Sequence, residues 1–175
     1  SIFGNARLVG LALAAVLLTG ALPDTAVAAP PRVEAAFGKD CETLLIREID
    51  RARKEIVVAI FSITRRNITS ALADAVRRGV AVRLKYDADS AKDDEMKDAL
   101  KVLRKQGIQC TRITMPEGYA KMHHKFAVID GTRVLTGSYN FTSSASTVNY
   151  ENLVLIESAE IAKPFAEEFE SIKGK

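Results

Sequence analysis

Hydrophobic positions along the chain form short runs that alternate with segments of helical periodicity. The most continuous run, residues 56–61, is almost entirely apolar, which is typical of a strand covered on both faces of a sheet. Two further runs flank Asp130-Gly131, a dipeptide that favours tight hairpin turns, so residues 123–129 are expected to pair with residues 133–136. The remaining strands are predicted at residues 80–86, 108–113 and 153–156.

Segments with apolar positions three and four residues apart lie between these runs and predict helices. They are built on Leu44, Leu45 and Ile49, on Ile68, Leu72 and Val76, on Met96, Leu100 and Leu103, and on Ile161, Phe165 and Phe169. Asp40 and Asn67 are expected to cap the first two helices, and Gly79 and Gly107 to end the second and third. Pro164 should lie in the first turn of the last helix.

Strands that alternate with helices indicate an α/β fold: a layered sandwich with a mixed, largely parallel central sheet flanked by helices. A chain of 175 residues is long enough for one domain of ordinary size, and we see no internal repeat in it. We therefore expect residues 30–175 to form a single catalytic domain. In such sheets ligands bind beyond the strand ends, so functional side chains are expected there.

Residues 1–29 have the parts of a secretory signal peptide. Arg7 precedes an apolar run at residues 8–22, and Ala26-Val27-Ala28 offers a cleavage site of small residues. The run is shorter than the roughly 20 residues that span a bilayer as a helix. We expect an exported protein, periplasmic or secreted. The alternative is a membrane-anchored protein in which residues 1–29 remain as an N-terminal anchor.

Charge and cysteine content leave several properties open. The formal net charge of +3 is a mild bias, compatible with a polyanionic partner without demanding one. Cys41 and Cys110 are the two cysteines of the chain, and their spacing does not match a zinc site. In an exported protein they would form a disulfide; otherwise they are two buried thiols.

The stretch from Met122 to Asn152 carries the candidate chemistry and both histidines of the chain. Side chains alternate across a strand, so His123 and Lys125 should share one face while His124 points to the other. The same step places Ser138 and Asn140 on one side. An imidazole, an ammonium, a hydroxyl and an amide that converge at strand ends suit an anionic phosphate group.

These residues also form a specific pattern, His-x-Lys-(x)4-Asp-(x)6-Gly-Ser-x-Asn. Its fixed positions are His123, Lys125, Asp130, Gly137, Ser138 and Asn140. The pattern resembles the HKD motif of the phospholipase D superfamily, and the order of elements from Phe37 onward is similar to its small, single-motif bacterial endonucleases. His124 stands where many members have Asp or Asn. The resemblance implies that Glu151, ahead of the last predicted strand, orients the catalytic histidine.

Hydrolysis through histidine needs two imidazoles, one that attacks phosphorus and one that protonates the leaving oxygen. His124 faces the wrong way to be the second, so a two-fold homodimer with a shared site is the economical solution, and the resemblance implies the same. His123 would be nucleophile or acid, while Lys125 and Asn140 hold the non-bridging oxygens. Ser138 is either a further site residue or a structural turn residue, and Asp130 is expected to be structural. No metal or other cofactor is required.

The predicted function is therefore a metal-independent phosphodiesterase that cleaves nucleic acid, DNA or RNA, through a phosphohistidine intermediate. The alternatives are a phospholipase D-type hydrolase of phospholipid and a non-catalytic nucleic-acid-binding module. Cations that could border a nucleic-acid groove, or be ordinary solvated charges, are Arg65, Arg66, Arg112 and Lys121. Beyond the leader, no apolar surface helix suggests a lipid slot, and the intact motif argues against a non-catalytic module.

Overall fold

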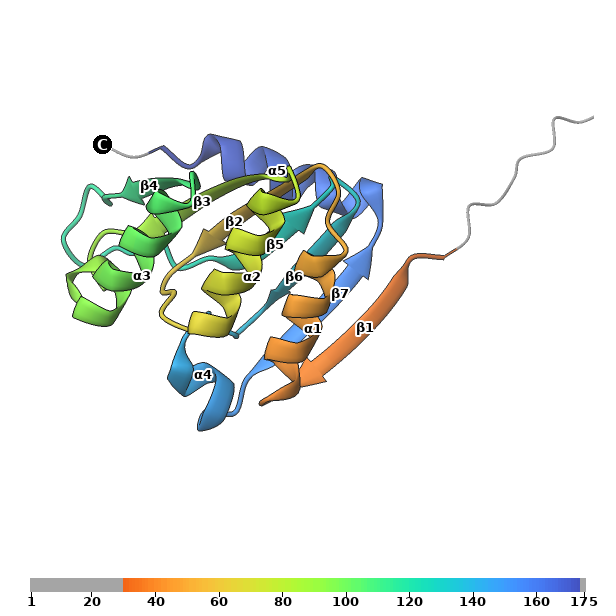
Figure 1. Ribbon diagram of the computed structural model, residues 1–175, viewed down its shortest axis with the longest axis horizontal. Coiled ribbons are helices and arrows are strands. Elements are labelled where there is room, and N and C mark those ends of the chain that lie inside the picture. The colour runs from red at the N-terminus through yellow and green to blue at the C-terminus, as the bar shows by residue number, and fades with distance from the viewer. Residues whose placement is uncertain (1–29, 174–175) are drawn as a thin grey trace, which may run out of the picture.

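The computed structural model describes residues 30–173, so the predicted leader at residues 1–29 lies outside the described residues. The strands are β1 (Arg32–Phe37), β2 (Glu55–Ile60), β3 (Ala81–Asp87), β4 (Gln109–Ile113), β5 (Lys125–Ile129), β6 (Arg133–Gly137) and β7 (Asn152–Glu157). They form one seven-stranded sheet in the order β1-β7-β6-β5-β2-β3-β4 (Figure 1).

Helices cover both faces of this sheet. They are α1 (Asp40–Asp50), α2 (Arg66–Arg77), α3 (Asp94–Lys105), α4 (Ser143–Thr147) and α5 (Ala159–Ser171), with a short 3-10 helix η1 (Ser90–Lys92). Figure 1 shows α1, α2 and α3 side by side on one face, α5 behind the sheet and α4 at one end of the strands. Lys85 fixes the end of α5, because its ammonium donates to the carbonyls of Phe169 (2.5 Å) and Ile172 (2.6 Å).

The pattern of β2 explains the two layers. Ile56, Val58 and Ile60 pack in the large core under α1, α2 and α3. Val57 and Ala59 point to the other face and pack in a second core with Phe169 of α5. Because both sets are buried, β2 reads as a continuous apolar run rather than an alternating one, as the sequence predicted.

The α/β class and the mixed sheet are confirmed, but the prediction that the sheet is largely parallel is wrong. Only the pairs β2–β3 and β3–β4 are parallel among the described strands. The pairs β2–β5, β5–β6, β6–β7 and β1–β7 are antiparallel. The tight turn after β5 reverses the chain, and β1 adds to β7 in the antiparallel sense.

Several predicted element ends need correction. Asp40 is the first residue of α1, not its cap, and Lys39 precedes it without a side-chain cap. Asn67 lies inside α2, where its amide donates to Glu42 at 2.7 Å instead of capping the helix. Pro164 lies inside α5, beyond the first turn, so one backbone donor of that helix is missing.

Asp130 has the structural role that the sequence predicted. It adopts a positive φ of 55° in the turn between β5 and β6. Its carboxylate accepts hydrogen bonds from the backbone N–H of Lys54 (2.8 Å) and from the guanidinium of Arg133 (2.8 Å). Burial alone would raise the pKa of Asp130, but these donors lower it below the usual value.

Cys41 and Cys110 are free thiols; Cys41 is buried, as the second alternative from the sequence expected, but Cys110 is only partly buried. Cys41 is on α1, beside the carbonyl of Ala36 at the β1 edge (3.4 Å), whereas Cys110 is on β4 at the other edge. Burial raises the pKa of both thiols to about 11. Within residues 30–173, no helix combines the length and apolar character needed to cross a membrane.

Candidate active site

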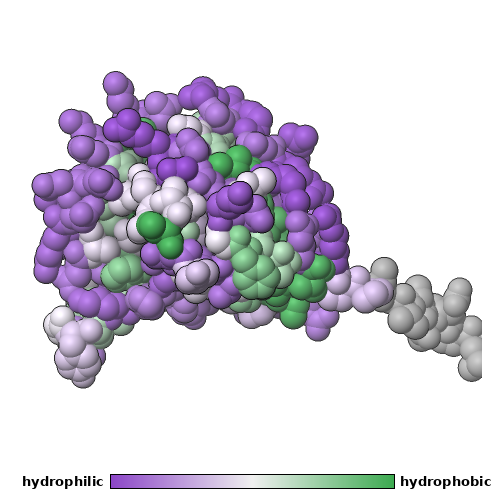
Figure 2. Space-filling view, turned by 90° about the horizontal axis from the view of Figure 1, so that it is seen from below, coloured by the Kyte–Doolittle hydropathy of each residue, from purple (hydrophilic) through white to green (hydrophobic). Residues whose placement is uncertain are grey.

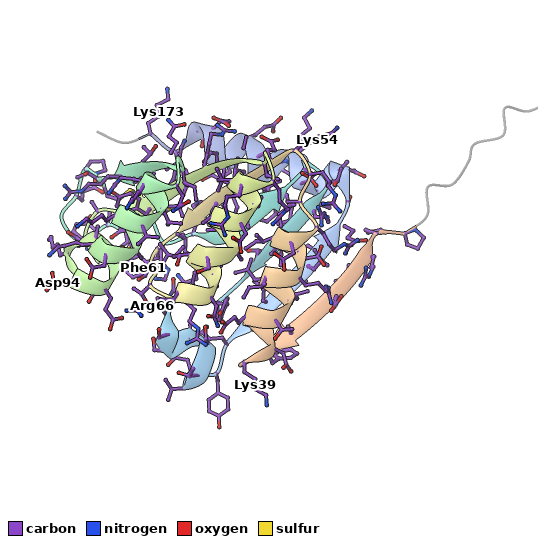
Figure 3. The ribbon with its side chains drawn as sticks, in the orientation of Figure 1. Lys39, Lys54, Phe61, Arg66, Asp94 and Lys173 are labelled. Carbon is purple, nitrogen blue, oxygen red and sulfur yellow. The ribbon has the colours of Figure 1, made fainter. Side chains whose placement is uncertain are left out.

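The candidate site lies where four strand ends meet. β2 and β6 end, and β5 and β7 begin, at the same end of the sheet, as shown by the registers Ile60↔Lys125 and Gly137↔Leu153. This is the end near α4 in Figure 1, where Figure 3 places Phe61 and Arg66. The topology therefore gathers side chains that are far apart in the sequence, as expected for a site beyond strand ends.

His123 and Lys125 are in direct contact. The ammonium of Lys125 lies 3.3 Å from each ring nitrogen of His123 and donates to the His123 carbonyl at 3.0 Å. β5 begins at Lys125 rather than at His123, so His123 belongs to the exposed segment just before the strand. An exposed imidazole beside a lysine can attack a phosphate whose charge the lysine holds.

Phe61 supports both of these side chains, a role that sequence analysis missed because its one local signal was the place of Phe61 at the end of the apolar run. Its ring packs against the ring of His123 with centroids 4.9 Å apart. The Lys125 ammonium lies 5.4 Å from the Phe61 ring centroid, within the range of a cation–π contact. Phe61 thus restricts the positions of the imidazole and of the ammonium together.

The surroundings of Lys125 weaken its hold on a proton. Burial desolvates the ammonium and lowers its pKa below the usual value, and the nearby Glu151 carboxylate opposes this in part. A half-buried lysine that lacks a close ion-pair partner within residues 30–173 is a strong donor for an incoming anion.

His124 points away from His123, as the strand geometry predicted. Its Nε2 lies 3.0 Å from a carboxylate oxygen of Glu168 on α5. Its ring contacts Phe126, two residues further along, with centroids 5.3 Å apart. One chain therefore presents a single imidazole on the Lys125 side.

Ser138 and Glu151 are held together. The Ser138 hydroxyl donates to Glu151 at 2.5 Å and accepts from the backbone N–H of Asn152 at 3.1 Å. The side chain of Asn149 donates to the other oxygen of Glu151 at 3.1 Å. Among the described residues, Glu151 receives no hydrogen bond from His123, so its orienting role stays a prediction.

Gly137 allows β6 to approach β7 closely before Ser138. A Cβ at this position would lie 2.3 Å from the backbone oxygen of Asn152, a separation that real Cβ atoms do not show. The glycine of the motif is therefore required by the close contact of two chain segments.

Asn140 lies in a loop fixed to the end of β2. The backbone N–H of Phe141 donates to Ser62 at 3.1 Å, and Thr64 donates back to Phe141 at 2.9 Å. The Asn140 side-chain oxygen is buried and has no hydrogen-bond partner within residues 30–173. A buried polar atom left without a partner calls for an explanation, which a bound ligand would supply.

The four cations proposed to border a groove separate into two pairs. Arg65 pairs with Glu42 at 3.0 Å, and Lys121 pairs with Asp89. Arg66 and Arg112 form no ion pair with the part of the chain that the structure describes. The last two are therefore the better candidates for contact with an anionic ligand.

No metal site is evident in the described part of the chain. Residues 30–173 contain no group of three or more His, Cys, Asp or Glu side chains that could hold a metal ion. Lys125 is the cation placed against the candidate nucleophile.

Comparison with known proteins identifies the family. Residues 45–173 match the family described as "Cardiolipin synthase, PLD-like domain". The chain therefore belongs to the phospholipase D superfamily, and the resemblance drawn from the motif is confirmed. This membership supports phosphodiester hydrolysis as the general class of chemistry.

Two curated relatives show similar levels of identity. The chain is 35% identical over 135 residues to "Phospholipase D" of Rickettsia bellii, covering 77% of this chain and 65% of that protein. It is 35% identical over 153 residues to "Mitochondrial cardiolipin hydrolase" of Canis lupus familiaris, covering 86% of this chain and 58% of that protein. The chain thus spans less than two thirds of the length of these relatives.

Solved structures share the fold. Nuc from Salmonella typhimurium, a phospholipase D family member, superimposes with a TM-score of 0.77 and 28% identity, covering 81% of this chain and 93% of that one. NucT from Helicobacter pylori superimposes with a TM-score of 0.70 and 24% identity, covering 81% of this chain and 96% of that one. This similarity shows a shared fold.

Proposed function

We propose that this chain is a metal-independent endonuclease that cleaves nucleic acid through a phosphohistidine intermediate, with an active site shared across a homodimer. The observation that carries the proposal is the exposed His123 in contact with Lys125, with the second histidine of the chain turned away to Glu168. One chain then supplies one imidazole, while the reaction needs two.

In the first step, the neutral imidazole of one protomer attacks phosphorus and forms a P–N bond. The P–O bond to the leaving nucleotide breaks, and the protonated imidazole of the second protomer gives its proton to that oxygen. In the second step, the second imidazole takes a proton from water, the resulting hydroxide attacks phosphorus, and the P–N bond breaks. Both imidazoles return to their starting protonation states.

Lys125 and Asn140 from each protomer stabilise the charge that builds on the non-bridging oxygens. Two ammonium groups and two amides act in a partly desolvated site, where fixed charges and dipoles act more strongly than in water. Ser138 contributes by holding Glu151, and Glu151 lies near enough to Lys125 to raise its pKa. Glu151 orients His123 in this proposal.

Nucleic acid is the favoured substrate because an exposed arginine lies at the site end of the molecule, where the exposed apolar side chains are Phe37, Val148 and Tyr150. Figure 2 looks onto this end of the molecule: hydrophilic residues form most of the outline, white and green residues also show in the centre, and a larger green patch lies toward the point where the chain enters β1. Arg66, exposed and without an ion-pair partner in residues 30–173, lies at the same end as Phe61 (Figure 3). An unpaired arginine beside the site suits a backbone phosphate.

Phospholipid is the second candidate substrate, and the names of the relatives "Phospholipase D" and "Mitochondrial cardiolipin hydrolase" favour it. A third, non-catalytic role in nucleic-acid binding would not need His123 in contact with Lys125. Export, to the periplasm or the medium, is part of the proposal because residues 1–29 have a signal-peptide pattern; retention of these residues as an anchor is the alternative.

Activity should persist in excess EDTA, because paired lysines and amides supply the charge that Mg²⁺ supplies in metal-dependent nucleases. The purified protein is assayed on plasmid DNA, RNA and phosphatidylglycerol vesicles, with and without EDTA. Cleavage of DNA or RNA at the same rate in both conditions is the expected result. Loss of activity in EDTA with recovery on addition of a divalent ion would refute the metal-independent mechanism. Hydrolysis of the lipid and of neither nucleic acid would show that phospholipid, not nucleic acid, is the substrate.

A further inference from the structure

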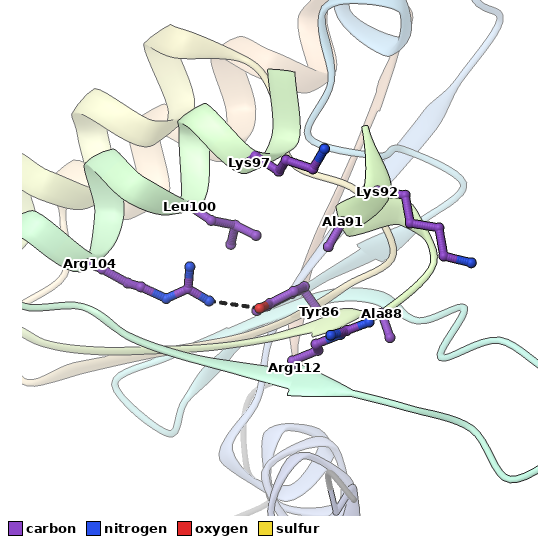
Figure 4. A pocket seen from close by; sticks show the side chains of 8 residues that line it. All are labelled: Tyr86, Ala88, Ala91, Lys92, Lys97, Leu100, Arg104 and Arg112. Atoms are coloured by element: carbon purple, nitrogen blue, oxygen red, sulfur yellow. Dashed lines mark hydrogen bonds between the residues drawn. The ribbon is translucent and has the colours of Figure 1, made fainter. Parts of the chain in front are cut away.

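A basic pocket of about 340 Å³ opens near the β3–β4 edge of the sheet, next to α3 (Figure 4). Four of its lining side chains are cationic, namely Lys92, Lys97, Arg104 and Arg112, and none is acidic. The volume is at the low end of the roughly 300–1,000 Å³ that is usual for small-ligand sites. A pocket of this size and sign suits a small anionic group.

The two arginines carry the free charge of this basic pocket. Lys92 and Lys97 lie 2.6 Å from Asp89 and Asp94, respectively, so their charges are largely balanced. Arg104 and Arg112 make no ion pair with any described residue. Arginine binds phosphate through its planar fork of N–H donors, so two unpaired guanidinium groups favour that ligand.

Tyr86 joins the arginines at the base of the pocket. Arg104 reaches down from α3 and donates to the Tyr86 hydroxyl at 2.7 Å (Figure 4). Because this oxygen accepts from Arg104, its own O–H remains available to donate. Arg112 is the register partner of Tyr86 on β4, so the two side chains stand next to each other on the same face. Arg104 of α3, Arg112 of β4 and the hydroxyl of Tyr86 on β3 therefore all offer hydrogen-bond donors to the pocket.

The basic pocket is connected to the candidate active site through η1. Ala91 and Lys92 of this short helix line the pocket, and Ser90 donates a hydrogen bond to the backbone oxygen of Phe61. Phe61 in turn packs on the ring of His123 with centroids 4.9 Å apart. Through η1, one wall of the basic pocket is therefore linked to His123 by one hydrogen bond and one ring contact.

We infer that the basic pocket is a second phosphate site, in which Arg104, Arg112 and the Tyr86 hydroxyl hold a backbone phosphate of the nucleic acid whose scissile phosphate lies at His123. The inference rests on the proposed endonuclease function and adds to it a binding subsite remote from the chemistry. Contacts of this kind read no sequence, because they reach phosphate and not base.

A nucleic-acid phosphate is favoured over a lipid phosphate by the surroundings. The apolar side chains that line the basic pocket are two alanines and Leu100, too few to receive an acyl chain. Of the exposed large apolar residues, Val33 and Phe37 belong to β1 at the opposite edge of the sheet, while Val102 of α3 and Tyr119 are not among the residues that line the pocket. A membrane surface would need apolar and basic groups on one side of the molecule.

The test measures binding of a single-stranded oligonucleotide of about 20 nucleotides to His123→Ala protein, so that no cleavage occurs. Adding R104Q and R112Q together should raise Kd about tenfold at moderate salt. It should also reduce the slope of log K against log salt by about 0.7, the value for one lost phosphate contact on a single strand. K105Q, which removes a charge from the exposed side of α3, is the matched control and should leave Kd within about twofold.

Because R104Q also removes the hydrogen bond to Tyr86, R112Q alone is the second variant. Arg112 makes no polar contact with another described side chain, so a weaker Kd there reports ligand binding and not folding. Unchanged Kd in R112Q and in the double variant overturns the inference, as does lost binding to phosphatidylglycerol vesicles with unchanged oligonucleotide binding. If wild-type protein fails to cleave nucleic acid but the Kd difference persists, the endonuclease proposal fails and the subsite stands.

Discussion

Substitution of His123 by alanine should abolish turnover, with kcat lowered by at least about 10²–10⁴-fold, the range for a single general acid or base. The loss should lie at or beyond the upper end of that range, because a dimer of the variant lacks both nucleophile and acid. Steady-state rates on a phosphodiester substrate, with circular dichroism to confirm the fold, measure the effect.

His124→Ala is the matched control, since both histidines are exposed neighbours in one segment. His124 contacts Glu168 and Phe126 on the side away from Lys125, so its removal should leave most of the activity. An exposed pair of this kind contributes at most about 1 kcal/mol to stability. Equal losses in the two variants, or retained turnover in His123→Ala, would show that the catalytic imidazole has been wrongly assigned.

Lys125→Met should lower kcat by about 10²–10³-fold, the cost of losing one preorganised donor to the transition-state charge. The same substitution should leave the melting temperature unchanged or raise it. Burial lowers the pKa of Lys125, so the folded protein holds this proton less tightly than the unfolded chain. The charged lysine therefore costs stability at neutral pH.

Measuring the stability of wild type and Lys125→Met as a function of pH checks the sign of the stability cost of the charged lysine. Below the folded-state pKa, both states carry the charge and the folded state bears the desolvation cost. As pH rises through that pKa toward the usual value near 10.5, the folded protein releases the proton and the cost disappears. The stability advantage of Lys125→Met should thus be largest at neutral pH and vanish at alkaline pH. A Lys125→Met variant that melts well below wild type would contradict the stability prediction, and a folded variant with wild-type kcat would contradict the catalytic role of Lys125.

The elements that the sequence predicted well are those fixed by local pattern. The buried run of β2 and the turn at Asp130-Gly131 are contained within a few residues, and both were found. β1 was not predicted, because Arg32–Phe37 pairs with β7, more than a hundred positions later. The sense of strand pairing is likewise set by the whole topology, which is why the sheet is less parallel than predicted.

The candidate site also combines features that local sequence pattern predicted with features that depend on the tertiary fold. Strand alternation predicted that His123 and Lys125 stand on one side, and their contact is observed although β5 begins only at Lys125. The support from Phe61 comes from the register of β2 against β5, which no local pattern encodes. The link from Ser138 to Glu151 depends on the close approach of Gly137 to Asn152, which is also a tertiary feature.

The shared site is the central claim, and subunit mixing tests it most directly. Wild-type chains are diluted into increasing excess of His123→Asn chains, complete subunit exchange is verified, and multiple-turnover activity is measured per wild-type chain. Each heterodimer has one imidazole and lacks either nucleophile or acid, so the activity per wild-type chain should fall toward zero as the excess grows. Constant activity per wild-type chain throughout the titration would show that each chain carries a complete site of its own, and would contradict the dimeric mechanism.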